Sequence, residues 1–311
     1  MSLSLSRSLT KAHRPSTNSQ WEFAWRKFQN FLRERNISEI SETSALEFLH
    51  ESFRSRNLQP GTVQGYKTAL AIPLLEGFGI DTTGKRFSLL MRSHFLARPP
   101  VQRFLPKWSL SRVLDFIQTE EDDSDDFLLK KSLFLVALAT ANRASEIAAM
   151  VRDSMVLEED MSNVMIAVRS RFLYKNQRQG RAPPNISIPS LKQDGSPHVL
   201  CPVTTLQSYV ERSRAWCKSS ALFCTRKSGA ALKASDVALH ICTLIEKACP
   251  GSIPKCHDVR KIGTSLAWCR GLEPNEIVKR TFWSSSNIFI ERYLTVSKDV
   301  PPPCVALGTR A

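Results

Sequence analysis

The sequence feature that most constrains the fold is a nearly apolar segment at 127–140. It reads FLLKKSLFLVALAT, and two adjacent lysines are its only charged residues. A helix that is apolar around most of its circumference has to be covered on several sides, so we predict a buried central helix here. The preceding block at 120–126, EEDDSDD, is strongly acidic. It predicts a solvated loop that also places negative charge at the N-terminus of this helix, with metal binding as a minor alternative.

A charged pair follows the apolar segment directly. The next residues read TANRASEIAAM, with a turn predicted at Asn142, then Arg143, then Glu146 three residues further on. An arginine at the end of a buried helix is costly unless it is paired or binds an anion, and Glu146 has the spacing to orient it. Such a pair taken alone is usually a surface ion pair, but its apolar flanks favour a buried position.

A second group of phosphate-directed side chains lies near the C-terminus. His257 and Arg260 are three residues apart and share one helical face, Trp283 follows after a Pro-containing turn, and Tyr293 comes last. Imidazole, guanidinium and indole groups can bind phosphate oxygens, and a phenol can attack phosphorus. Each residue alone has an ordinary explanation as a helix cap, a core residue or one tyrosine among four.

Between these two groups the hydrophobic pattern changes from helical to alternating. Residues 163–173 alternate apolar and polar side chains, and NISIP at 185–189 forms a second short run, so we predict a β-hairpin. The segment that joins the two runs is strongly basic and predicts contacts with a nucleic-acid backbone or groove. Its basic residues are Arg169, Arg171, Lys175, Arg178 and Arg181.

The N-terminal hundred residues predict a small helical bundle. Apolar residues from Trp21 to Leu32 share one helical face, and Pro73 should kink or end a helix that begins at Pro60. Residues 1–18 are Ser-rich, basic and free of acid, which favours a disordered arm over an organellar transit peptide. Residues 99–107 belong to a Pro-rich basic stretch that predicts an extended linker carrying Arg98, Arg103 and Lys107 to a bound duplex.

These patterns predict a mainly α-helical chain with a small antiparallel β-sheet. The expected organisation is an arm at 1–18, a helical domain at 19–98, a linker at 99–107, a second domain at 108–296 and a tail at 297–311. The further helices are expected at about 42–56, 86–96, 109–118, 202–218, 234–248, 257–269 and 286–294, with a restart at Pro274 after a break at Gly271.

Composition limits the partners. The 311 residues carry a formal net charge of +14, which favours a polyanion, either nucleic acid or an acidic membrane face. No apolar run approaches the length of a membrane span. The eight cysteines form no CxxC pair, so we expect no structural zinc and reduced cysteines in an intracellular protein.

The candidate residues, read in order, resemble the catalytic domain of the tyrosine recombinases, also called the phage integrase family. That family has an Arg in T-G-x-R-x-S-E-L, a Lys on a β-hairpin, H-x-x-R, then His or Trp, then Tyr. Here TANRASEI stands for the first motif and HDVR for the third, and WSSSNIFIERY and FLYKNQ resemble recombinases of DIRS and Ngaro retroelements. The resemblance covers about 107–296, and the N-terminal bundle matches the family's core-binding domain in position and size.

The resemblance implies an integrase-like mixed α/β catalytic domain that exchanges DNA strands without a cofactor or metal. Tyr293 would attack a phosphodiester, form a 3′-phosphotyrosyl link and release a 5′-hydroxyl. The other implied roles are oxygen binding by Arg143, Arg260 and Trp283, orientation of Arg143 by Glu146, proton transfer from the phenol by His257, and general-acid catalysis by Lys175, with Lys192 and nearby arginines as alternatives.

The same resemblance implies partners and a location. We expect double-stranded DNA, a homotetramer on paired sites, no membrane, and action inside the cell, in the nucleus if the host is eukaryotic and otherwise in the cytoplasm. A mobile element would be the DNA integrated. The alternatives are a catalytically silent DNA-binding protein, a type IB topoisomerase-like enzyme, and a helical adaptor for anionic protein or lipid.

The sequence departs from the family pattern at three positions. Asn142 stands before the first Arg, where we expect the family's Gly, and Asn also adopts left-handed backbone. Lys261 replaces a second His that many members have after H-x-x-R, and it is a further candidate DNA contact. The interval from Trp283 to Tyr293 is one residue longer than in many phage members.

Overall fold

The computed structural model describes residues 14–99, 106, 108–177, 180, 185–282 and 285–292, without the side chains of Gln193, Ile288, Glu291 and Arg292. The chain divides into two compact units, 1–102 and 103–311, and each is described by itself. In the part of the chain that is described, no helix has the length and apolar character needed to cross a bilayer.

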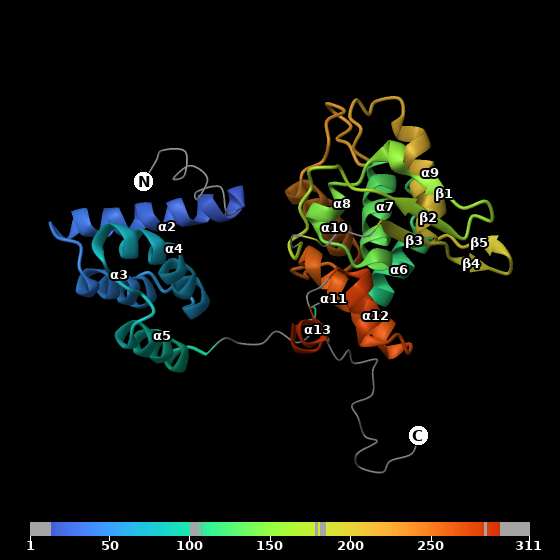
Figure 1. Cartoon of the computed structure of the whole chain (residues 1–311). Coiled ribbons are helices and arrows are strands. Elements are labelled where there is room, and N and C mark those ends of the chain that lie inside the picture. The colour runs from blue at the N-terminus through green and yellow to red at the C-terminus, as the bar shows by residue number, and fades with distance from the viewer. Residues whose placement is uncertain are drawn as a thin grey trace, which may run out of the picture. The chain divides into compact units, whose positions relative to one another are not determined.

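The N-terminal unit is a bundle of helices, as its hydrophobic periodicity predicted (Figure 1). Aromatic side chains fill its centre, with the Phe28 and Phe48 rings 5.3 Å apart and neither exposed. The Ser41 hydroxyl accepts from the Ser44 backbone N–H and caps the second helix. The helices are α2 (Pro15–Glu34), α3 (Glu42–Arg54), α4 (Pro60–Phe78) and α5 (Lys85–Ala97).

Two predictions for this unit were wrong. The first helix begins at Pro15, so residues 15–18 are helical and do not belong to a disordered arm; proline is well suited to a first helical position. Of the kink or end predicted at Pro73, the end is wrong, because helix α4 continues through this residue. A mid-helix proline costs about 3 kcal/mol. Full burial of Leu70 and Leu74 on either side contributes about 1.5–3 kcal/mol each, which offsets that cost.

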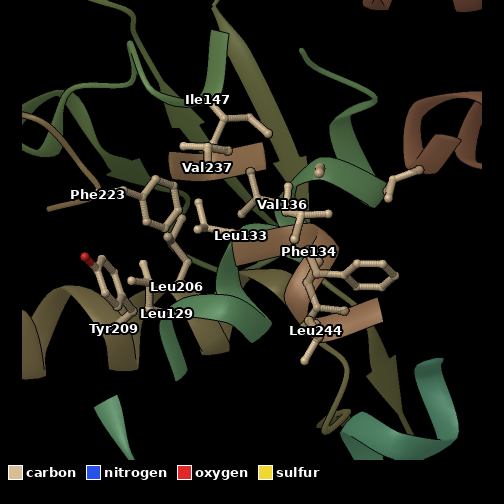
Figure 2. Close-up of a cluster of buried hydrophobic side chains, with 14 of the residues drawn as sticks. Leu129, Leu133, Phe134, Val136, Ile147, Leu206, Tyr209, Phe223, Val237 and Leu244 are labelled. Carbon is tan, nitrogen blue, oxygen red and sulfur yellow. The ribbon is translucent and has the colours of Figure 1, made fainter. Parts of the chain in front are cut away.

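The second unit is built around α7 (Asp125–Thr140), the buried central helix that the apolar segment predicted. It packs against α9 (Pro202–Ser213), α10 (Ala234–Ala248) and α11 (Cys256–Cys269). Figure 2 shows Leu133 and Val136 of α7 beside Leu206 and Val237 from two of these neighbours. The acidic block precedes and opens α7, and Ser124 caps the helix by accepting from the backbone N–H of Phe127.

The remaining helical elements of this unit are shorter or lie at its periphery. Helix α12 packs against α11 and α13. A short α8 directly follows the turn at the end of α7. Their bounds are α6 (Leu110–Thr119), α8 (Ala144–Ile147), the 3-10 turn η1 (Arg152–Ser154), α12 (Pro274–Arg280) and α13 (Ser286–Arg292).

A small antiparallel sheet is present, in the order β1-β2-β3. Its strands are β1 (Val156–Leu157), β2 (Asn163–Ile166) and β3 (Ile186–Pro189), with Val164 opposite Ile188. The predicted strand at 163–173 is wrong in length. Residues after Ile166 leave β3 and pair with the chain that follows α8, where the Arg169 N–H donates to the Ala149 carbonyl.

Three further features were not predicted. A second pair of short strands, β4 (Lys192–Gln193) and β5 (Ser196–Pro197), follows β3. Helix α9 ends at Ser213 rather than near 218. Cys217 and Cys224 are joined by a disulfide, although reduced cysteines were expected, because the chain after α9 turns back and brings their Cα atoms to 5.7 Å.

Helix α11 approaches the C-terminal half of α7 very closely at Gly263. A Cβ atom added to this glycine would lie 2.8 Å from the backbone oxygen of Leu138. Real Cβ contacts are longer, so a side chain here would force the two helices apart. The glycine therefore sets the depth at which α11 lies against α7, and with it the position of Arg260 one turn earlier.

We expect Gly263→Ala to lower the free energy of unfolding of the second unit. Overpacking costs about 1–3 kcal/mol, which outweighs the roughly 1 kcal/mol that Ala gains over Gly in a helix. Urea unfolding measures this change in the free energy of unfolding, and hydrogen exchange of the α11 amides shows whether it arises at that helix. Gly65→Ala in α4 is the matched control. A Cβ added there would meet nothing within 4 Å, so the substitution should stabilise the chain. Equal effects of both substitutions would contradict the close approach.

Candidate active site

A buried carboxylate lies where α7 gives way to α8. Glu146 is 1% exposed, and its Oε1 accepts from the Arg143 Nη1 at 2.7 Å. Its Oε2 accepts from the backbone N–H of Arg143, also at 2.7 Å. The Arg143 side chain is 21% exposed. The predicted pairing of Arg143 with Glu146 is present. The Glu146 carboxylate lies inside the protein, as the apolar residues on either side of the pair predicted.

The same carboxylate meets a second arginine from a distant part of the sequence. Arg260 on α11 is 2% exposed, and its Nη1 lies 3.7 Å from the Glu146 Oε2. Its Nη2 donates to the carbonyl oxygen of Thr281 at 3.0 Å. One carboxylate thus fixes two guanidinium groups, and the second of them also fixes the backbone that leads to Trp283.

The turn before Arg143 uses Ala141, not Asn142, as its left-handed residue. Ala141 has φ 51° and ψ 29°, while Asn142 does not have positive φ. In T-G-x-R the glycine corresponds to Ala141, so the expected role of Asn142 was assigned one residue too late. An L-residue pays roughly 1–2 kcal/mol for this conformation. Burial of Ala141 and packing of the flanking helix hold the turn.

Lys175 lies in a segment that is anchored on both sides. Its own side chain is exposed, but Tyr174 before it is 2% exposed. The Tyr174 ring meets the Phe282 ring edge-on at 5.2 Å, and the Asn176 Nδ2 donates to the Phe282 carbonyl at 3.3 Å. Burial, together with the negative charge of Glu146, raises the pKa of Tyr174 to about 12. That phenol therefore stays protonated near neutral pH.

His257 lies in the first turn of α11, three residues before Arg260. Partial burial lowers the pKa of its imidazole below the usual 6.5, Asp258 opposes this shift, and Lys261, Lys255 and Arg260 reinforce it. The ring is consequently neutral at pH 7, so one nitrogen can accept a proton. Lys261 is partly exposed on the same helix.

The predicted DNA contacts fall into different environments. Arg169 and Arg171 are exposed on the second unit. Arg98 belongs to the N-terminal unit, where its guanidinium donates to the Leu58 carbonyl at 2.9 Å and stacks 4.5 Å from the Phe53 ring centre. Its contacts there are structural. The candidates that lie outside the described residues are Trp283, Tyr293, Arg103, Lys107, Arg178 and Arg181.

The described groups together can bind and polarise an anion. Arg143, whose side chain is 21% exposed, offers donors to a tetrahedral oxyanion, and the buried Arg260 adds a second positive charge on the same carboxylate. Such positive groups act more strongly as negative charge develops. His257, on the same helix as Arg260, adds a proton acceptor, and Lys175, in the segment that contacts Phe282, adds a proton donor. Among the residues described, no group of His, Cys, Asp and Glu side chains could hold a metal ion.

Sequence inspection missed the residues that hold this site together. Tyr174, Asn176, Thr281 and Gly263 contact or position the named groups. Tyr174 and Asn176 lie within FLYKNQ, from which only Lys175 was chosen as a site residue. For Gly263 the available signal was a glycine inside an otherwise amphipathic helical pattern, because such glycines often mark close packing. The backbone carbonyls of Thr281 and Phe282 have no sequence signal at all.

No protein-family model matches this chain, and no curated protein matches it by sequence. Solved structures do match. A XerH site-specific recombinase bound to difH substrate in a pre-cleavage complex has a TM-score of 0.59 at 16% identity, covering 87% of this chain and 74% of that one. This chain has the tyrosine recombinase fold.

Two further structures agree on that fold. A lambda integrase dimer bound to a COC′ core site has a TM-score of 0.59 at 12% identity, covering 91% of this chain and 89% of that one. The Tn1549 transposon integrase in complex with transposon right end DNA has a TM-score of 0.60 at 12% identity, covering 90% of each chain. Identities this low establish the fold alone, so the chemistry has to be argued from the residues.

We expect Glu146→Ala to destabilise the second unit by about 3–5 kcal/mol, because it leaves two guanidinium groups without their shared carboxylate. Thermal unfolding measures the loss. Glu276→Ala is the matched control: its carboxylate is 51% exposed and lies 3.9 Å from Arg280, and exposed pairs contribute at most about 1 kcal/mol. Similar losses in the two variants would show that Glu146 does not hold the site together.

Proposed function

We propose that this chain is a site-specific DNA recombinase that cleaves and rejoins strands through a 3′-phosphotyrosyl intermediate. The observation that carries the proposal is the buried Glu146 carboxylate that gathers Arg143 and Arg260. Two oriented guanidinium groups suit the two non-bridging oxygens of a phosphodiester. The fold shared with XerH, lambda integrase and Tn1549 integrase supports it, and so does the net charge of +14.

The proposed reaction needs one nucleophile, one base and one acid. The Tyr293 oxygen bonds to phosphorus while the bond from phosphorus to the 5′-oxygen breaks. Neutral His257 takes the phenolic proton, and Lys175 gives a proton to the departing 5′-oxygen. Arg143 and Arg260 stabilise the charge that builds on the non-bridging oxygens, and Trp283 adds an indole donor. The new phosphotyrosyl link conserves the phosphodiester energy, so a 5′-hydroxyl can reverse the step without a cofactor.

The surroundings of the other tyrosines favour Tyr293 as the nucleophile. The sequence has four tyrosines. Burial raises the pKa of both Tyr174 and Tyr209, and the Tyr209 hydroxyl also accepts from the backbone N–H of Cys224. Tyr66 stacks on Phe48 in the core of the N-terminal unit. Tyr293 is the remaining phenol, and it has the position expected from the family motif.

The finer features of the proposal concern assembly and biological role. The lambda integrase structures include a tetramer bound to a Holliday junction, and we propose a homotetramer on paired DNA sites here. The motifs WSSSNIFIERY and FLYKNQ support a mobile element of the DIRS or Ngaro type, acting in the nucleus of a eukaryotic host or otherwise in the cytoplasm. Exposed Arg169 and Arg171 would contact phosphates beside the cleavage site.

We expect the protein to form an SDS-resistant covalent adduct with nicked suicide duplexes taken from the terminal repeats that flank its coding sequence. The nick lets the 5′-hydroxyl fragment escape, so the phosphotyrosyl link accumulates. Tyr293→Phe should give no adduct, whereas Tyr66→Phe should retain it. Absence of an adduct on every terminal repeat would favour a silent DNA-binding protein, and relaxation of supercoils without recombinant product would favour a topoisomerase.

The lowered pKa of His257 sets a pH dependence for adduct formation. The imidazole accepts a proton only when neutral, so at subsaturating DNA the rate should rise as pH increases through a value below 6.5 and level off by pH 7.5. Rate measurements between pH 5 and 8 test this, with His257→Gln expected to be slower and to lack the inflection. A wild-type rate that is flat over this range would contradict the assignment of His257 as base.

A further inference from the structure

The carbonyl oxygens of Thr281 and Phe282, the two residues just before Trp283, each accept a side-chain hydrogen bond. Arg260 donates from Nη2 to the Thr281 oxygen at 3.0 Å, and Asn176 donates from Nδ2 to the Phe282 oxygen at 3.3 Å. The Tyr174 ring adds an edge contact to the Phe282 ring, with centroids 5.2 Å apart and planes at 66°. The segment at 174–176 is thus attached to the same short stretch of backbone that anchors a phosphate-directed arginine.

The backbone that receives these contacts is strained. Phe282 has φ 53°, which is uncommon and unfavourable for a bulky residue. Such conformations persist only where the surroundings fix them, and they cluster at functional sites. The Phe282 side chain is 4% exposed, and its ring and carbonyl are both contacted from the 174–176 segment. These contacts therefore help to keep Phe282 in its left-handed conformation.

Lys175 lies between the two residues that make the contact. Its side chain is exposed, and holding such a long side chain in one geometry costs rotamer entropy. The contacts of Tyr174 and Asn176 fix the backbone on both sides of Lys175. The ammonium is then confined to the small volume that its side chain can reach from one fixed Cα atom.

We propose that Asn176 and Tyr174 are positioning residues that clasp Phe282 and so place Lys175 for proton donation to the departing 5′-oxygen. This inference rests on the proposed recombinase function. The contacts on Phe282 connect the segment that carries Lys175 to the Thr281–Phe282 backbone, which Arg260 also contacts. The residue that protonates the leaving group and the residue that stabilises the phosphate charge are therefore positioned by the same stretch of backbone. Asn176 acts through its hydrogen bond to the Phe282 carbonyl.

The clasp predicts a selective defect. Without the Asn176 amide, Lys175 is present but misplaced, while Arg143, Glu146 and Arg260 keep their contacts. We expect the variant to protonate the departing 5′-oxygen less well and to stabilise the phosphate charge as well as the wild type does. A DNA substrate with sulfur in place of the bridging 5′-oxygen separates these steps, because a thiol of pKa near 8.5 leaves as a thiolate without a general acid.

We expect Asn176→Ala to slow single-turnover cleavage of ordinary DNA by about 10²-fold, as general-acid loss does. On the 5′-thio substrate its rate should return to within a few fold of wild type, as should that of Lys175→Ala. Arg260→Ala should stay slow on both substrates. Asn185→Ala is the matched control: Asn185 lines the same cavity of about 380 Å³ as Tyr174 and Phe282, and we expect wild-type rates.

The outcomes separate the clasp from the function on which it rests. If the wild type cleaves neither substrate, the recombinase proposal fails. If the wild type cleaves both and Asn176→Ala stays equally slow on the 5′-thio substrate, or cleaves ordinary DNA at the wild-type rate, the clasp is overturned. Asn176→Asp keeps the side-chain shape but removes the donor, so the same rescue is expected of it if the alanine variant does not fold.

Discussion

The site depends on a single buried carboxylate. Removing a carboxylate or a guanidinium from water costs several kcal/mol per ion, and a buried pair is stable only when its hydrogen bonds are well made. Glu146 meets that requirement on Arg143, where it accepts from both the backbone and the side chain. Its contact with Arg260 is an ion pair, with Nη1 at 3.7 Å, and is longer than a hydrogen bond. Because such an arrangement tolerates little displacement, the helices that carry these residues have to be placed accurately.

Three features of the fold supply that accuracy. The close approach at Gly263 brings α11 onto α7 and sets the depth of Arg260. The left-handed Ala141 ends α7 and turns the chain so that Arg143 opens α8. The left-handed Phe282 receives contacts from the loop that carries Lys175, directly after the carbonyl that receives Arg260. Strain thus lies on both sides of the site, and the packed core of α7 and its neighbours offsets it.

Local periodicity was sufficient to predict most of the long helices. The apolar run indicated α7, and spacing alone indicated that Arg143 and Glu146 pair and that His257 and Arg260 share one helix. Where tertiary packing overrides a local rule, prediction failed. Burial of Leu70 and Leu74 carries α4 through Pro73, and pairing with the chain after α8 shortens β2 at Ile166. The contact of Arg260 with Glu146 and the clasp on Phe282 join residues far apart in sequence, and no local pattern encodes them.

We propose that Glu146 holds Arg143 and Arg260 so that they neutralise the charge of a scissile phosphate. The most direct measurement compares cleavage of ordinary DNA with cleavage of DNA carrying an uncharged methylphosphonate at the scissile position. Arg143→Ala should be slowed by about 10²-fold or more on ordinary DNA. It should cleave the methylphosphonate at close to the wild-type rate, because that substrate has no phosphate charge to neutralise. Equal impairment of Arg143→Ala on both substrates would contradict the account.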